Sequence, residues 1–163
     1  MGNSTGTDDQ VRVPPTWDPG LVGLYRERYL AYVRLAYLLT GRRMVAEELT
    51  QEAFVATHRA WARVESPGAY VRAAVVNRCR SWMRRQRVER VHEPPPPEPA
   101  ELEADELWDA LGRLDHRRRT AIVLRFYEDL PDDEIAEVLG CRPATVRTLV
   151  HRALKDLRKE ISR

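Results

Sequence analysis

The sequence has few of the residues that build metal centres and disulfide frameworks. It contains only two cysteines, Cys79 and Cys141, which lie far apart and outside any CxxC or Cys/His spacing. This pattern argues against both a zinc site and a disulfide scaffold. We expect the two cysteines to be small buried or half-buried side chains of a protein in a reducing compartment.

Long apolar runs are also missing. Stretches such as "LAYLLTG" and "TAIVL" are among the longest, whereas a membrane-spanning helix needs about 18 or more apolar residues. The N-terminal "MGNSTGTDDQVRVPP" lacks the basic start and apolar stretch of a secretory signal peptide. The sequence therefore predicts a soluble, cytoplasmic protein.

Lysine is nearly absent, because only Lys155 and Lys159 are lysines among the 27 cationic residues. Arginine favours bidentate contacts to phosphate and guanine. The net charge of +2 conceals three blocks. Residues 66–92 carry seven arginines and one acid, residues 93–109 carry seven acids and no base, and residues 110–163 have a balance of +3. Basic blocks of this kind either bind phosphate groups or are ordinary solvated helix faces, and the charge pattern alone does not distinguish these two interpretations.

The first half of the chain predicts three helices. The first begins with Asp18 as N-cap and Pro19 as first helical residue, and ends at Gly41. The second is expected over residues 43–63, and the third starts at Pro67 with Ser66 as its N-cap. No segment shows the alternation of a strand.

The segment "HEPPPPEPAELEADE" interrupts this helical pattern. Four consecutive prolines cannot continue a helix and favour an extended spacer. After it, four more helical segments are expected: "LWDALGRL", "HRRRTAIVLRFYEDL", "PDDEIAEVLG" and "PATVRTLVHRALKDLRKEI". The predicted fold is all-α, with two small helical domains joined by a proline-rich acidic linker. The expected boundaries are a disordered tail over 1–17, a first domain over 18–90, the linker over 91–104 and a second domain over 105–163.

The segment "IAEVLGCRPATVRTLVHRALKDLR" has the pattern of a helix-turn-helix. Ala136 is the small residue at the helix crossing, Gly140 is able to take a positive φ in the turn, and Val146 packs inside. The outer face of the second helix carries Arg147, Thr148, His151, Arg152 and Lys155. Residues in the first turns of a recognition helix contact base edges, and the later ones clamp phosphate. A helical hairpin that only packs would show the same apolar pattern.

Two further patterns precede the proline run. The segment "AEELTQEAFVATHRAW" predicts an amphipathic helix with an acidic face formed by Glu48, Gln51 and Glu52. The same residues would also suit an ordinary solvated helix surface without a partner. A carboxylate-bridged metal site is rejected, because the Glu-x-x-His spacing is missing and His58 lies off that face. In "AYVRAAVVNRCRSWMRRQRVER", aromatic and amide side chains alternate with arginines, which suits exposed bases and phosphates. A helix with core aromatics and solvated arginines fits that segment equally well.

Together the two halves resemble a bacterial sigma factor of the extracytoplasmic-function (group IV) branch, of the actinobacterial type. "AYLLTGRRMVAEELTQEAFVATHRAW" resembles the family's regions 2.1–2.2, and "SPGAYVRAAVVNRCRSWMRRQR" resembles regions 2.3–2.4. "LWDALGRLDHRRRTAIVLRFYEDLPDDEIAEVLGCRPATVRTLVHRALKDLR" resembles region 4. The resemblance covers about residues 20–160 and identifies the two predicted domains as sigma region 2 and sigma region 4.

This resemblance implies a function for each region. Region 4 of the family reads the −35 promoter element, which implies contacts from Arg147, Thr148, His151, Arg152 and Lys155. Region 2 captures a flipped base of the −10 element, which implies contacts from Ser66, Asn77, Arg78, Arg84 and Arg85. Region 2 also binds the clamp helices of RNA polymerase core, which implies contacts from Glu47, Glu48, Gln51 and Glu52. The resemblance further implies that the linker threads the polymerase's RNA channel, and it leaves an anti-sigma factor as a possible partner. It implies no cofactor, metal or small-molecule substrate.

Two departures from the family pattern predict atypical promoter sequences. The loop at 64–69, which corresponds to the family's flipped-base loop, is short. Leu149 stands where many relatives have a basic residue, and Thr148 replaces a common serine. We therefore expect the −10 preference and the −35 motif both to differ from those of typical members.

Two other classes of protein remain as alternatives. A stand-alone helix-turn-helix regulator would bind its operator without polymerase and would usually dimerise, but no dimerisation helix is evident. A helical interaction protein without a DNA role would show no salt-dependent DNA binding. An enzyme is not expected, because the sequence has no nucleophile–base pairing, phosphate loop or metal cluster.

Overall fold

The computed structural model describes residues 16–89 and 106–162, and within them every regular element is helical. The expected linker over 91–104 and nearly all of the expected tail over 1–17 lie outside the described residues. Trp17 was predicted to belong to the disordered tail, but its ring packs in the first lobe. It is stacked with the rings of Phe54 and His58, at centroid distances of 6.4 and 5.7 Å. The ordered first domain therefore begins before residue 18.

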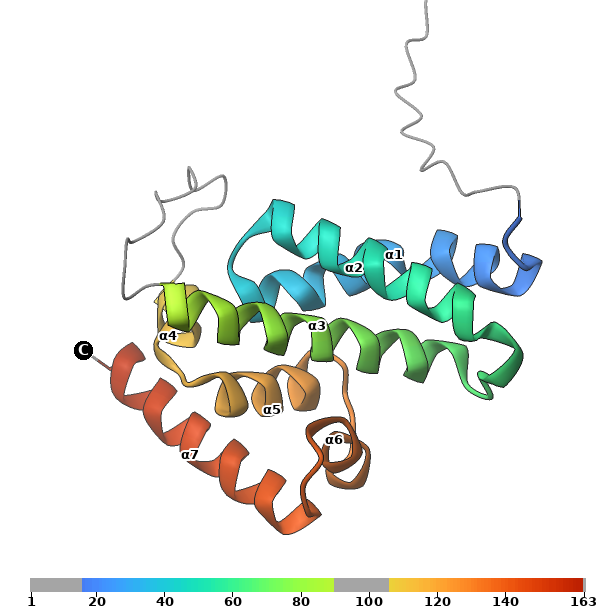
Figure 1. Cartoon of the computed structure of the whole chain (residues 1–163). Helices are drawn as coiled ribbons and strands as arrows, with labels where there is room; N and C mark the ends of the chain where they lie inside the picture. Colours follow the sequence, from blue (N-terminus) through green and yellow to red (C-terminus); the bar gives the residue numbers. More distant parts are fainter. Residues whose placement is uncertain (1–15, 90–105, 163) are drawn as a thin grey trace, which may run out of the picture.

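The first lobe is a bundle of three helices, α1 (Pro19–Thr40), α2 (Arg43–Ala60) and α3 (Pro67–Glu89) (Figure 1). The Asp18 carboxylate accepts a hydrogen bond from the Gly20 amide at 2.8 Å, which caps α1 as predicted. Gly41 ends α1 in the left-handed conformation with φ of 72°. The second helix is shorter than predicted, because after Ala60 the chain tightens into a 3₁₀ turn over Trp61–Arg63.

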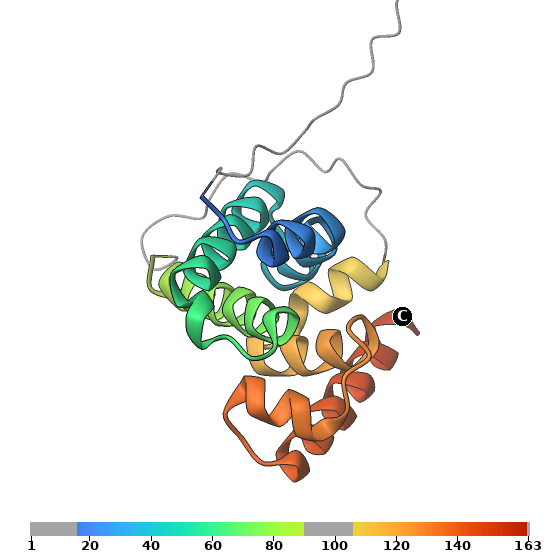
Figure 2. The same ribbon diagram turned by 90° about the vertical axis from the view of Figure 1, so that its right-hand side faces the viewer.

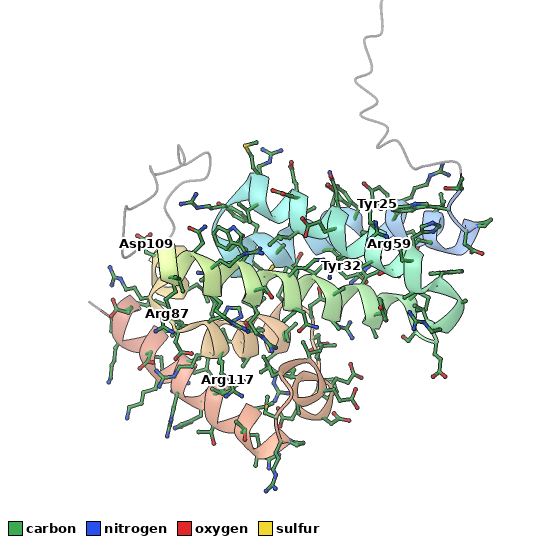
Figure 3. All side chains as sticks on the ribbon, viewed as in Figure 1. Tyr25, Tyr32, Arg59, Arg87, Asp109 and Arg117 are labelled. Carbon is green, nitrogen blue, oxygen red and sulfur yellow. The ribbon has the colours of Figure 1, made fainter. Side chains whose placement is uncertain are left out.

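Aromatic side chains fill the first lobe. Phe54 is fully buried, and the rings of Tyr25 and Tyr32 meet its ring edge-on at centroid distances of 4.7 and 5.9 Å. Both tyrosines project from α1 into the bundle (Figure 3). The Tyr32 hydroxyl donates to the Gly68 carbonyl at 3.0 Å, which ties α1 to the start of α3. This cluster fixes the orientation of the outward faces of α2 and α3.

The second lobe contains α4 (Glu106–Arg113), α5 (His116–Phe126), α6 (Asp132–Leu139) and α7 (Pro143–Ile161). Asp115 caps α5 as predicted, because its carboxylate accepts a hydrogen bond from the Arg118 amide at 3.0 Å. The prediction that this helix continues to residue 130 was wrong. The chain leaves the helix after Phe126, and Asp129 adopts a positive φ of 52° in the turn before α6.

The two lobes are in direct contact through α5. This helix lies against α1 and α3 on one side and against α7 on the other, in both views of the molecule (Figures 1 and 2). The sequence predicted two domains on a tether and gave no sign of this contact. Among the helices of residues 16–89 and 106–162, none has the length and apolar character that a membrane span requires.

Candidate nucleic-acid and protein interfaces

The helix-turn-helix is formed by α6 and α7. Gly140 ends α6 with φ of 63°, and the Cys141 amide donates to the Ala136 carbonyl at 3.0 Å to close the turn. Ala136 is buried at the crossing, and Val146 is completely buried beneath the first turns of α7. The local sequence thus places one face of α7 inward and leaves the other to solvent, as predicted.

The outward face of α7 carries all five side chains predicted to contact duplex DNA. Arg147, Thr148, His151, Arg152 and Lys155 are exposed. The Arg147 guanidinium lies 3.7 Å from the Asp132 carboxylate of α6, and Thr148 donates to the Ala144 carbonyl at 3.2 Å. An ion pair as exposed as that of Arg147 is weak, so this guanidinium is available to another acceptor. Leu149 does not belong to this face, because it is half-buried against the core.

The basic face of α7 extends beyond the predicted residues. A shallow groove of about 620 Å³ runs along the second half of the helix, with Leu154 in its apolar lining. Its other lining residues are His151, Lys155, Arg158, Lys159 and Ser162. Sequence reasoning missed Arg158 and Lys159, although their spacing from Lys155 by three and four residues places them on the same face.

The exposed side of α3 carries most of the residues predicted to contact unpaired bases. Asn77, Arg84 and Arg85 are exposed on α3, and Ser66 is exposed just before it. Arg78 is different, because it is half-buried and its guanidinium lies 3.8 Å from the Glu52 carboxylate of α2. The structure therefore places Arg78 between the predicted nucleic-acid face and the acidic face rather than wholly on the former.

Arginines of the basic block on α3 divide between two sides of the helix. Arg84 and Arg85 face solvent, whereas Arg72 and Arg80 contact the second lobe. Tyr70 is partly exposed, at 40%, on the solvent side of the same helix. Trp82 is half-buried, with the Arg42 guanidinium 5.8 Å from its ring centroid. Tyr70 is thus free to stack on a base, whereas Trp82 serves packing.

The predicted acidic face lies on α2. Glu48, Gln51 and Glu52 are exposed, while Glu47 is half-buried and paired with Arg43 at 3.3 Å. A groove of about 480 Å³ follows this face, and its lining residues are Glu48, Gln51, Glu52, Val55, Ala56, Arg59 and Arg78.

Two exposed apolar side chains extend the acidic face. Met44 and Val55, which sequence reasoning missed, are 76% and 39% exposed and share the helical side of Glu48. Exposed apolar side chains beside carboxylates suit a protein partner with basic and apolar residues better than a nucleic acid.

Two ionisable groups inside the described part of the chain have shifted pKa values. Burial raises the pKa of the Cys79 thiol to about 12, so this thiol is protonated at neutral pH. Burial, together with the charges of Arg80 and Arg119, lowers the pKa of His116 to about 4. Within residues 16–89 and 106–162, no three His, Cys, Asp or Glu side chains group as metal ligands.

Comparisons with known proteins match both lobes. The family model of Sigma-70 region 2 matches residues 24–89, and that of Sigma-70 region 4 matches residues 104–157. The RNA polymerase sigma-E factor of Streptomyces coelicolor is 33% identical over 150 residues, which cover 83% of this chain and 85% of that protein. The ECF RNA polymerase sigma factor SigE of Mycolicibacterium smegmatis is 33% identical over 96% of this chain and 65% of its own length.

Solved structures show the same fold. The sigma factor RpoE of Bartonella quintana, crystallised with the anti-sigma factor NepR, aligns with a TM-score of 0.70 at 22% identity. That alignment covers 86% of this chain and 97% of the Bartonella chain. The extracytoplasmic function sigma factor SigJ of Mycobacterium tuberculosis aligns with a TM-score of 0.63 at 26% identity, over 83% of this chain and 52% of SigJ. From the motifs, the two matched regions and these relatives, the chain belongs to the extracytoplasmic-function branch of the sigma-70 family, the sigma factors that direct RNA polymerase to promoters.

Proposed function

We propose that this chain binds RNA polymerase core through the exposed face of α2 and reads promoter DNA through α3 and α7. The observation that carries the proposal is that one acidic face and two arginine-rich faces are exposed on separate helices of one small molecule. The α2 face is acidic with apolar edges, and the faces of α3 and α7 are rich in arginine. The chain acts in the cytoplasm, where its polymerase and promoter partners are.

The α7 face supports recognition of the −35 element as duplex. Arg147, Thr148 and His151 lie in the first half of an exposed helix that follows a helix-turn-helix turn, and this is the part of such a helix that reaches base edges. Arg152 and Lys155 extend the face along the helix, where phosphate contacts follow.

The α3 face supports capture of unpaired bases at the −10 element. Asn77 offers both a hydrogen-bond donor and an acceptor, and Tyr70 offers an exposed ring for stacking. Ser66, Arg84 and Arg85 supply further polar and cationic groups. Arg78 contributes to this face only if it leaves Glu52, to which it is bound at 3.8 Å.

The α2 face supports binding to the clamp helices of the polymerase. Glu48, Gln51 and Glu52 present acidic and amide groups between the apolar side chains of Met44 and Val55. An anti-sigma protein is a further proposed partner, on the precedent of the Bartonella complex.

The experiment compares two double variants in core binding and promoter binding. Arg147→Ala with Arg152→Ala should lower promoter affinity by about 1–3 kcal/mol for each arginine that hydrogen-bonds a base, and should leave core binding unchanged. Glu48→Ala with Gln51→Ala should weaken core binding and leave the DNA affinity of the assembled complex intact. Glu27→Ala, at an exposed position on α1, is the control and should change neither. An equal decrease of core binding in both double variants would refute the assignment of faces.

A stand-alone helix-turn-helix regulator is the second candidate function, because the outer face of α7 is already exposed in the chain by itself. Tight, sequence-specific binding to duplex DNA in the absence of core would favour it over the sigma-factor mechanism.

A further inference from the structure

Three charged side chains connect the end of α5 to the DNA-reading face of α7. Arg125, in the last turn of α5, donates through Nη2 to Oδ1 of Asp132, the first residue of α6. The other oxygen of the same carboxylate, Oδ2, lies 3.7 Å from Nη1 of Arg147 on α7. The Asp132 carboxylate therefore contacts one arginine with each of its oxygens and links all three helices.

The carboxylate is the fixed member of this group. The Asp132 side chain is 22% exposed, whereas that of Arg147 is 63% exposed. Asp132 stands at the N-terminus of α6, where the positive end of the helix dipole stabilises a carboxylate. It also follows Pro131, whose ring restricts the backbone at the start of the helix. Since Arg125 holds one oxygen from behind, Asp132 constrains the longer and more exposed Arg147 side chain rather than the reverse.

Arg147 is the side chain of the α7 face that gains most from such a constraint. Arginine reads guanine by presenting two N–H groups at once to the O6 and N7 atoms, so the plane of the guanidinium has to be set. A free arginine side chain loses rotamer entropy when it is fixed against a base, and a contact made before binding reduces that loss. Arg147 is also the only cation of the predicted −35 face with an ion pair within residues 16–89 and 106–162.

The next residue of α6 provides a natural comparison for Asp132. Asp133 shares the first turn of α6 and carries the same charge, but its side chain is exposed. In the described part of the chain, Asp133 forms no ion pair or side-chain hydrogen bond. Any carboxylate near the DNA backbone repels phosphate, so both residues oppose non-specific binding in the same sense. Only Asp132 contacts a residue of the reading face.

We propose that Asp132 is a positioning residue for promoter recognition. Held by Arg125, it orients the Arg147 guanidinium toward one base pair of the −35 element and so sets the specificity at that pair. It acts through Arg147 and needs no contact with DNA of its own. This inference rests on the proposed function of α7 in reading duplex DNA, and it names a residue that determines how selective that reading is.

The test measures discrimination at each base pair of the −35 element. The protein is the full chain assembled with bacterial RNA polymerase core. The probe is the genomic promoter fragment that gives the strongest run-off transcript with the unmodified chain, together with derivatives in which each −35 base pair is replaced in turn. Competition binding gives the discrimination at each position. Arg147→Ala identifies the base pair that Arg147 reads, as the position at which discrimination decreases most.

A matched pair of variants isolates the positioning effect. Asp132→Asn should lower discrimination at the base pair that Arg147 reads by about two- to fivefold, the range that an exposed ion pair provides, and should leave the other positions unchanged. Asp133→Asn removes an equal charge one residue further along and should change discrimination at no position. A general gain in affinity from the lost charge appears in both variants and cancels in this comparison. In an Arg147→Ala background, Asp132→Asn should have no further effect.

Two further measurements keep the test independent of folding defects and of polymerase. Arg125→Gln releases Asp132 from its anchor without altering Asp132 itself, and it should lower discrimination at the same base pair. In the free chain, nitrogen relaxation of the Arg147 Nε–Hε group should show a lower order parameter with Asp132→Asn and an unchanged one with Asp133→Asn. Circular dichroism on each variant checks that helix content is retained.

Three outcomes would overturn the proposal. The first is an equal loss of discrimination at every base pair with Asp132→Asn, because Asp132 would then only support the fold. The second is unchanged discrimination at the base pair that Arg147→Ala identifies. The third is an Arg147 order parameter that is the same with Asp132→Asn as with Asp133→Asn. Failure of the chain to bind core would refute the proposed function, whereas the order parameter would still decide whether Asp132 holds Arg147.

Discussion

The positive φ of Gly140 in the helix-turn-helix predicts how much an alanine there would destabilise the fold, and Gly112 in α4 provides the control. Gly140 has φ of 63°, and a Cβ built there meets no atom within 4 Å. Gly112 also has open space around it, but it lies within α4 and has no positive φ. Gly140→Ala and Gly112→Ala therefore add the same methyl group without steric conflict and differ in the backbone conformation they require.

The two substitutions should change stability in opposite directions. An alanine in the left-handed region destabilises the folded state by about 1–2 kcal/mol. Alanine also lowers the conformational entropy of the unfolded chain, which offsets about 0.4–1 kcal/mol of that cost. Gly140→Ala should therefore lower the free energy of unfolding by about 1 kcal/mol, or the Tm by about 2–4 °C for a chain of this size. Gly112→Ala should raise the free energy of unfolding by about 0.5 kcal/mol, because alanine is the better helix former.

Thermal and urea unfolding followed by circular dichroism measure both changes. Gly140→Asn is a useful third variant, because asparagine tolerates the left-handed region and should be less destabilising than alanine. If Gly140→Ala were neutral or stabilising, the turn would not need its positive φ, and the argument for the geometry of α6 and α7 would fail.

Three further predictions concern the core, pH and salt. Phe54→Ala should lower the free energy of unfolding by about 3–5 kcal/mol, whereas Val55→Ala, one residue away but 39% exposed, should change it far less in the same denaturation assay. The pKa of His116 is lowered to about 4 from 6.5, so the unfolded chain binds more protons between these values, and stability present above pH 6.5 should be lost as the pH falls toward 4. His116→Gln should flatten that dependence in melts at a series of pH values, and an unchanged slope would contradict the assignment. Lys155→Ala should reduce the salt dependence of promoter binding by about 0.9 in log–log slope, and an unchanged slope would show that this side chain contacts no phosphate.

The sequence was sufficient to predict the helices and the signals that begin and end them. The caps at Asp18 and Asp115 and the turns at Gly41 and Gly140 all depend on interactions within a few residues, so local patterns find them. The end of α5 was missed, because nothing in "FYEDL" requires the helix to stop at Phe126. The bend there depends on packing of the turn at Glu128 against the other lobe.

The exposure of the proposed contact residues was predictable where it depends on one helix and not where it depends on two. The outward positions of Arg147, His151 and Lys155 follow from the apolar stripe on the same helix. The contacts of Arg72 and Arg80 with the second lobe could not be predicted from the sequence. An arginine on a helix surface has the same sequence pattern whether water or a second lobe covers it. The sequence contains no periodic signal for a contact between domains.

The most direct measurement is run-off transcription with purified bacterial RNA polymerase core, with and without this chain, on a library of genomic promoter fragments. The account predicts discrete transcripts that require both components, whose upstream sequences share motifs near −35 and −10. Absence of such transcripts, combined with tight binding of the chain alone to duplex DNA, would contradict it.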